Sequence, residues 1–433
     1  MKSWHALAPL LAVLGLTGCA SSPLLDAAEA RDFTRLSKEI EAARKSGELD
    51  DGTVRDVAAV VASGEIENAK GLEGEKLVGG LVGCAPALES ALDDRAEKDD
   101  DVAATASWVL LSAGLEDEDE FADYALDNDP RAAFRALGAR SLVDLDDADL
   151  RRKLFLDLDE RVRLGALKAA LSSPIDADFD ALLEAARLDP SSQARSTAAR
   201  ALGQIGGTRS AYALKDLWLR ADGRLREAVA AGWAAPATFE AGGRDQLQNA
   251  AEAGGEGSVH AALLLSRIPE LDAKAKAARA SAMGVLVRVI KQGTREDRSV
   301  AILMAPTSTE ILDAVREAKD TGDTAVAILA QARLVREGKP DEQKKAKEKL
   351  FELAKKADDP DAPRARAELA TLGDKRVVPM VEKELSSKNP FARAYAARTL
   401  VTLGESPRAA GLLADKEAQV RVDVACAIVS RED

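Results

Sequence analysis

Apolar and polar positions follow a helical period through residues 189–220, and the pattern predicts two short helices joined by a turn. Asp189 is suited to cap the first helix, and Gly206 with Gly207 end it. Each predicted helix has a single apolar stripe, so the hairpin has no core of its own and has to stack on copies of itself. The stripes consist of Ala194, Ala198, Ala201, Leu202 and Ile205, then Ala211, Leu214, Leu217 and Trp218.

The same pattern recurs along the chain. Residues 392–404 match residues 194–206 at seven of thirteen positions, and Val420 with Arg421 begin another copy. Arginines near the start of four predicted helices are separated by 28, 32 and 31 residues, the length of one hairpin; they are Arg135, Arg163, Arg195 and Arg226. The chain is therefore expected to be an array of hairpins.

These residues resemble the HEAT-repeat family, including its bacterial short-repeat branch. The matching motif consists of Asp189, Pro190, Ala194, Arg195, Ala198, Ala199, Leu202 and Gly206. The resemblance implies an all-α fold, a right-handed α-solenoid of stacked antiparallel helix pairs. It also implies that the recurring arginines reach acidic or carbonyl groups of the neighbouring repeat. It implies no particular activity.

Coverage of the motif divides the chain. The motif is clear in residues 129–241 and 358–433, and degenerate in residues 242–357. Residues 24–128 are expected to form divergent N-terminal repeats that cap the array, with helices over residues 24–44, 53–62 and 77–92. Three glycines at positions 254, 255 and 257 are interpreted as a turn, because no lysine and hydroxyl pair of a phosphate-binding loop follows them.

Residues 1–18 have the charged start and short apolar run of a secretory signal. The run is too short to span a bilayer. The following Leu-Thr-Gly-Cys resembles the bacterial lipobox, which implies that Cys19 is lipidated and that residues 19–23 form a short tether. The sequence therefore predicts an outer-membrane lipoprotein of the bacterial envelope, facing the periplasm or the cell surface. An ordinary signal peptide is the alternative.

Little catalytic chemistry remains once this leader is removed. His260 is then the last histidine, and Cys84 and Cys426 are the last unmodified thiols. These residues are too few for a zinc site and leave one histidine for any Ser-His-Asp triad, so neither a catalytic residue, a cofactor nor a metal is expected. Because the two cysteines would lie near opposite ends of an extended stack, we expect two buried, unpaired thiols.

Hydrophobic residues make up 46% of the 433 residues but aromatic ones only 3%, which fits an interior of alanine and aliphatic side chains. Trp108, Trp218 and Trp233 are accordingly expected in the core. The formal net charge is −14, and residues 93–160 hold 21 acidic and 8 basic residues, a balance of −13. We call this segment the acidic belt.

The acidic belt has two interpretations. Its carboxylates can cap helices and lie in solvated loops, or they can bind a basic partner; the spacing of a calcium loop is absent. The partner-binding candidates are Glu116, Asp117, Glu118, Asp119 and Glu120. With a pI near 5.0 the chain is not expected to bind nucleic acid.

Three functions remain open. The first is a lipid-anchored, non-enzymatic scaffold or adaptor that binds another envelope or surface protein through its helical-repeat surface. The second is a repeat-containing enzyme of the lyase type or a carboxylate-based hydrolase. The third is a structural spacer that self-associates through unlike charges on its two halves.

Overall fold

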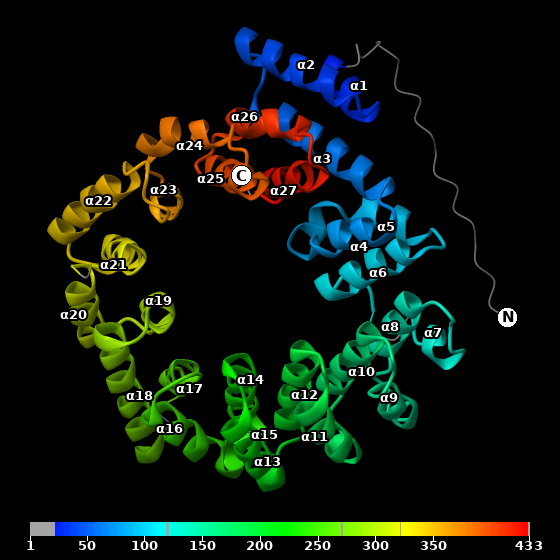
Figure 1. The fold of residues 1–433 in the computed structure, drawn as a ribbon, viewed down its shortest axis with the longest axis vertical. Helices are drawn as coiled ribbons and strands as arrows, with labels where there is room; N and C mark the ends of the chain where they lie inside the picture. The colour runs from blue at the N-terminus through cyan, green and yellow to red at the C-terminus, as the bar shows by residue number, and fades with distance from the viewer. Residues whose placement is uncertain (1–21, 118–120, 270–271, 321, 432–433) are drawn as a thin grey trace, which may run out of the picture.

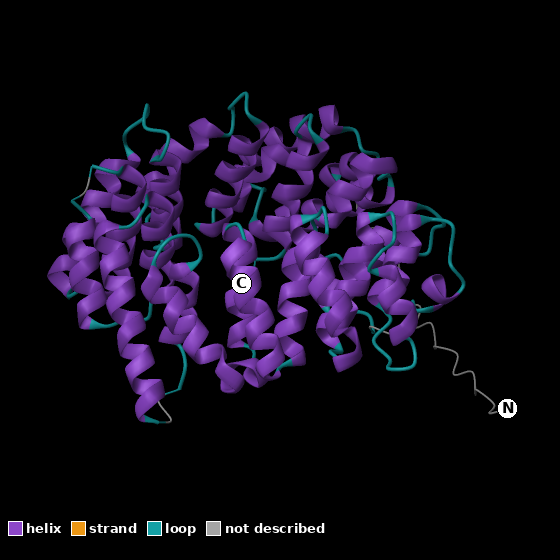
Figure 2. Ribbon diagram, turned by 60° about the horizontal axis from the view of Figure 1, so that its bottom comes forward, coloured by secondary structure: helices purple, strands orange, loops and turns teal. Residues whose placement is uncertain are grey.

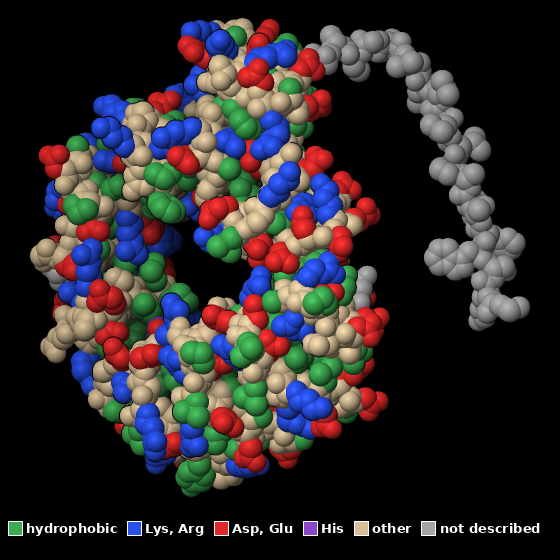
Figure 3. All heavy atoms as spheres, turned by 45° about the vertical axis from the view of Figure 1, so that its right-hand side comes forward, with side chains coloured by type: hydrophobic (Ala, Val, Ile, Leu, Met, Phe, Trp, Pro, Cys, Tyr) green, Lys and Arg blue, Asp and Glu red, His purple; other side chains and the backbone are tan. Residues whose placement is uncertain are grey.

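The computed structural model describes residues 22–117, 121–269, 272–320 and 322–431. Within these residues the secondary structure consists of helices joined by turns and loops (Figure 2). The helices form two concentric rows around an open centre, which also appears as a hole in the space-filling view (Figures 1 and 3). The all-α solenoid predicted from the repeats is confirmed.

The inner row lines the opening, and each of its helices packs against the next one along the chain (Figure 1). Its members are α4 (Gly71–Gly79), α6 (Asp101–Ala113), α8 (Ala132–Arg140), α10 (Glu160–Ser172), α12 (Ser192–Ile205), α14 (Gly223–Ala234), α17 (Ser258–Ser266), α19 (Arg295–Met304), α21 (Thr324–Glu337), α23 (Ala362–Thr371), α25 (Pro390–Thr402) and α27 (Ala418–Val429).

The outer row completes the hairpins. It comprises α5 (Glu89–Ala96), α7 (Asp123–Leu126), α9 (Ala148–Leu154), α11 (Phe179–Leu188), α13 (Gly207–Arg220), α15 (Pro236–Thr238), α16 (Arg244–Ala253), α18 (Ala273–Gln292), α20 (Thr309–Ala318), α22 (Pro340–Ala354), α24 (Val378–Glu384) and α26 (Ser406–Ala409). Short helical segments adjoin these rows: η1 (Val82–Ala87), η2 (Asp176–Asp178), η3 (Phe239–Gly243), η4 (Lys375–Val377) and η5 (Ala410–Ala414).

The two ends of the array meet, and the array is therefore a closed ring. The N-terminal helices α1 (Pro23–Glu29), α2 (Phe33–Ser46) and α3 (Asp51–Glu67) lie beside the C-terminal repeat, where α3 packs along α27 and α2 packs on η5. One core cluster joins Val57 of α3 to Leu353 of α22 and Val424 of α27. We call the junction of α2, α3 and η1 with α27 and η5 the seam.

The expectation of an extended stack was wrong. A repeated sequence fixes the contacts between neighbouring hairpins, but the path of the stack depends on the small rotation from each hairpin to the next. Over the whole array these rotations add up to a full turn. The last helix, α27, thereby acquires α3 as the packing partner that a following repeat would otherwise supply.

Local signals explain the best-defined hairpin. Gly206 and Gly207 have φ of +86° and +76°, values that favour glycine, and α12 ends there as predicted. The cap of α12 differs from the prediction, because Ser191 Oγ accepts the Ala194 N–H at 3.3 Å. Asp189 instead accepts the Ser191 N–H at 2.8 Å and turns toward the preceding repeat.

The N-terminal segments differ from their predicted bounds. Residues 24–44 contain two helices, α1 and α2, because the chain turns at Arg31, which has φ of +51°. The predicted helix over residues 53–62 extends to Asp51–Glu67, and residues 77–92 are divided among α4, η1 and α5. The glycines at 254, 255 and 257 all have positive φ and form the predicted turn. No helix among the described residues has the length and apolarity needed to cross a bilayer.

Candidate binding surfaces

The recurring arginines link consecutive repeats. Arg163 Nε donates to Asp189 Oδ2 at 2.8 Å, and its Nη1 donates to the Asp157 carbonyl at 2.9 Å. Arg393 makes the same pair of contacts, to Asp415 and to the Ser387 carbonyl. We call the recurring arginines the arginine ladder, and the contacts of Arg163 and Arg393 confirm the structural role that the family resemblance implied.

The last arginine of the ladder closes the ring. Arg421 Nη2 lies 2.6 Å from Oε1 of Glu65 on α3, 356 residues away along the chain. Arg31 contacts the same carboxylate oxygen at 3.0 Å, and the Arg421 guanidinium lies 3.9 Å from the Phe33 ring centroid. Glu65 thus occupies the place that an acidic residue of the next repeat has at the internal junctions.

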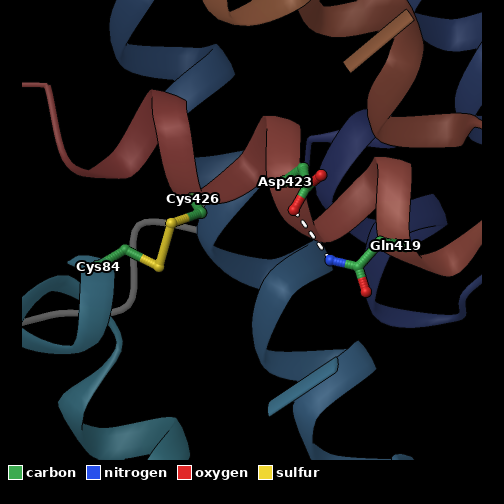
Figure 4. Close-up of a disulfide and its surroundings, with 4 residues drawn as sticks. All are labelled: Cys84, Gln419, Asp423 and Cys426. Carbon is green, nitrogen blue, oxygen red and sulfur yellow. Dashed lines mark hydrogen bonds between the residues drawn. A yellow bond between two sulfur atoms is a disulfide. The ribbon is translucent and has the colours of Figure 1, made fainter. Parts of the chain in front are cut away.

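A disulfide between Cys84 and Cys426 also spans the seam (Figure 4). Cys84 lies in η1 and Cys426 in α27, with their Cα atoms 5.6 Å apart, within the usual range for a disulfide. The prediction of two unpaired thiols was therefore wrong, and it failed for the same reason as the extended stack. Figure 4 also shows Gln419 of α27, which donates to Asp423 at 2.9 Å.

Part of the acidic belt is structural. Asp100 caps α6 by accepting the Ala103 N–H at 3.0 Å, and Asp159 accepts the Arg161 N–H at 2.8 Å at the start of α10. The Arg131 guanidinium, which donates to Asp129, holds the pKa of that carboxyl below its usual value. These carboxylates match the interpretation as caps and internal partners.

Most of the exposed belt carboxylates that serve no such role lie in outer-row helices or in the loops beside them. Red side chains gather along the right-hand edge in Figure 3. Seven exposed aspartates of the belt make no ion pair with any described residue: Asp93, Asp94, Asp117, Asp123, Asp127, Asp144 and Asp146. They lie in α5, in the loop after α6, in and after α7, and in the loop before α9.

The structure places only part of the predicted partner-binding set. Glu116 is half-buried just after α6, and Asp117 beside it is exposed. Glu118, Asp119 and Glu120 lie outside the described residues, as does Cys19. Six of the seven exposed aspartates lie beyond the run at 116–120 and enlarge the acidic surface, and the sequence signal for them is the same local excess of acidic residues.

Basic side chains recur at one position of the repeat on four inner helices. Five residues after the ladder arginine, successive inner helices place Arg140 on α8, Lys168 on α10 and Arg200 on α12. The same position on α25 is Arg398. Sequence reasoning missed this row, although aligning the repeats on their ladder arginines is enough to find it.

Trp233 is buried and donates its indole N–H to the Ala211 carbonyl at 3.1 Å. Trp218 is half-buried beside it, with ring centroids 5.4 Å apart. Both fit the core prediction, whereas Trp108 is half-buried on the inner row.

His260 Nδ1 lies 3.5 Å from Glu227 Oε1. The described residues hold no group of three or more His, Cys, Asp or Glu side chains arranged for a metal ion.

Comparison with known proteins gives no family assignment. No family model matches the chain, and no curated protein matches it. A crystal structure of an engineered protein from the Northeast Structural Genomics Consortium is 21% identical with a TM-score of 0.27, covering 82% of this chain and 96% of that one.

Kap121p is 12% identical with a TM-score of 0.29, covering 93% of this chain and 47% of Kap121p, so the chain spans about half the length of that protein. A mutant of Kap121p is also 12% identical, with a TM-score of 0.28. These TM-scores are too low to indicate a shared overall shape. The helical-repeat fold is therefore assigned from the helices and their packing in this chain.

Proposed function

We propose that this protein is a lipid-anchored, non-enzymatic ring scaffold that binds another protein of the bacterial envelope. The observation that carries the proposal is the Cys84–Cys426 disulfide across the seam. Disulfides of this kind persist in oxidising compartments outside the cytosol. The disulfide therefore supports export, which the leader at residues 1–18 also favours.

The proposed anchor is a lipid on Cys19, from the Leu-Thr-Gly-Cys motif. Helix α1 begins at Pro23, four residues later. Fully extended chain covers roughly 3.5 Å per residue, so the ring would sit within about 14 Å of the acylated residue. The membrane in this proposal is the outer membrane, on its periplasmic or surface side.

The proposed partner is basic and binds the acidic belt on the outer edge of the ring. The seven exposed aspartates named above support this role, because they serve neither as caps nor as ion-pair partners of the described residues. Complementary charge chiefly raises the association rate and selects the partner. The repeat-containing enzyme and the self-associating spacer remain the alternatives to this scaffold.

Photo-crosslinking in intact cells tests the proposal. The test variant changes Glu116, Asp117, Glu118, Asp119 and Glu120 to their amides; the matched control makes the same change at five exposed carboxylates outside the belt, Asp245, Glu296, Asp320, Asp341 and Asp358. We expect a basic envelope protein crosslinked to the wild type and the control but depleted with the belt variant. Equal crosslinking of that protein to all three would contradict binding by the run at residues 116–120.

Cys19→Ser tests the anchor separately. The variant should leave the membrane fraction, and the N-terminal peptide of the wild type should carry the mass of an acyl group. Retention of Cys19→Ser in the membrane, or a wild-type peptide without acyl mass, would overturn the lipid anchor.

A further inference from the structure

A pocket of about 360 Å³ opens on the inner row, between α4, α6, α8, α10 and the start of α12. No helix of the outer row contributes to it. Alanines 104, 133 and 136 line its apolar floor, and Leu72, Trp108 and Leu164 line its walls. Cavities that bind small organic ligands have about this volume, roughly 300 to 1,000 Å³, and are mostly apolar with a few polar groups that orient the ligand.

The hollow comes from a local change in the repeat. When α8 and α10 are aligned on Arg135 and Arg163, Ala133 corresponds to Arg161 and Ala136 to Leu164. Helix α8 therefore presents methyl groups where the next repeat presents long side chains. The shorter side chains leave the space between α6 and α10 unfilled.

Lys168 places one ammonium group at this hollow. Its Nζ lies 4.4 Å from the centroid of the Trp108 ring, and no carboxylate of the described residues forms an ion pair with it. Burial lowers the pKa of the Lys168 ammonium, and the nearby Arg140 lowers it further. A half-buried cation on an indole face, without an anion, is an environment in which an incoming carboxylate gains a charge-assisted hydrogen bond.

The other two cations that line the pocket, Lys76 and Arg161, are already paired with carboxylates. Lys76 Nζ lies 3.0 Å from Glu73 Oε1. Arg161 Nη1 contacts Glu75 at 2.9 Å, and Arg161 Nη2 contacts Asp159 at 3.1 Å. One available ammonium matches a singly charged carboxylate better than a phosphate, which would need several donors. The apolar floor requires that the rest of the ligand be apolar.

We propose that this pocket binds a small apolar monocarboxylic acid, with the carboxylate on Lys168 and the aryl or acyl body between Trp108 and the alanine floor. The site is separate from the acidic belt. Its ligand has the opposite charge from the basic partner proposed for the belt, so the two binding events can be tested independently.

Isothermal titration of the disulfide-bonded protein with 4-phenylbutyrate and with its neutral counterpart 4-phenylbutan-1-ol tests the proposal. We expect the wild type to bind the acid at least ~10-fold more tightly than the alcohol, as a charged hydrogen bond of about 1.5 kcal/mol or more implies. Lys168→Met, which keeps the stem and removes the charge, should abolish that preference. Lys215→Met, at an exposed position of α13, is the control and should keep the preference for the acid.

Trp108→Phe supplies a second readout, since loss of indole area should weaken acid and alcohol alike. Circular dichroism checks that each variant is folded. The proposal is overturned if the wild type binds acid and alcohol equally or binds neither, or if folded Lys168→Met retains the preference for the acid.

Discussion

The seam and the internal junction between α12 and α14 join helices of the same repeat type by different means. At the internal junction the backbones come so close that a Cβ on Gly203 would lie 2.3 Å from the Gly232 Cα. Arg195 lies 3.6 Å from Asp222, whose side chain is exposed. The seam instead uses a buried carboxylate shared by two arginines and a disulfide.

The difference follows from chain connectivity. A short loop holds consecutive hairpins together, so a junction such as α12–α14 can rely on close packing. Other internal junctions bury an ion pair like that of the seam, Arg163 with Asp189 and Arg393 with Asp415, but no disulfide spans them. The seam brings together cysteines separated by 342 residues, and the entropy cost of closing a loop grows with its length. The disulfide and the second arginine on Glu65 are therefore found at the junction that no short loop holds together.

Removing the shared carboxylate should have the largest effect on the seam. Glu65→Ala leaves the buried Arg421 guanidinium without its anion, and breaking a buried pair in this way costs about 3–5 kcal/mol. Urea unfolding measures the loss. The control is Glu67→Ala, two residues farther along α3, where the side chain is exposed. If the two variants unfold within about 1 kcal/mol of each other, the ion pair does not hold the ring closed.

Loss of the disulfide should be next in size. Cys84→Ser with Cys426→Ser is expected to cost about 2–5 kcal/mol by relaxing the constraint on the unfolded chain. Hydrogen exchange should rise in α3 and α27 and change little in α12. Peptide mapping of the oxidised wild type provides the control, and free thiols at both positions would contradict the bond.

At the internal junction, Gly203→Ala should cost about 1–3 kcal/mol, because a methyl group has to force α12 and α14 apart. Gly284→Ala is the matched change in an exposed part of α18, where an added Cβ meets nothing within 4 Å. Removing glycine there should stabilise the protein by about 0.4–1 kcal/mol. Opposite signs for the two changes in urea unfolding would establish the close approach, and equal signs would refute it.

The smallest effect is expected from the exposed ladder position at the α12–α14 junction. Arg195→Ala removes a partly exposed ion pair and a bond to the Asp189 carbonyl, so its cost should be about 1 kcal/mol. Arg421→Ala at the equivalent seam position should cost several times more in the same unfolding experiment. Equal costs would mean that the seam is energetically an ordinary repeat junction.

The sequence predicted the parts of the fold that depend on neighbouring hairpins. The apolar stripe of α12, its end at Gly206 and the ladder contacts of Arg163 and Arg393 are all local, and the structure contains them. The seam could not be predicted in this way, because no single repeat encodes the summed rotation that brings Cys84 to Cys426. The cap of α12 was mispredicted for a related reason. Asp189 and Ser191 are both suited to cap the helix, but Asp189 pairs with Arg163 of the preceding repeat, and Ser191 is the cap.

The binding surfaces were predicted unequally. The acidic excess marked the belt, but it did not distinguish carboxylates such as Asp100 and Asp159, which cap helices, from exposed ones such as Asp117. The pocket at Lys168 was missed because Trp108 was assigned to the core. Comparing Ala133 and Ala136 with their counterparts in the next repeat reveals the missing volume.

Helix α3 packs along α27, so the segment made early in synthesis has to wait for one made near the end. Until α27 emerges, part of the apolar face of α3, which includes Val54, Val57 and Val61, has no partner. Long-range contacts of this kind form slowly, and exposed apolar surface invites aggregation in the meantime. Biogenesis of the ring therefore depends on protecting its first helices until the last one arrives.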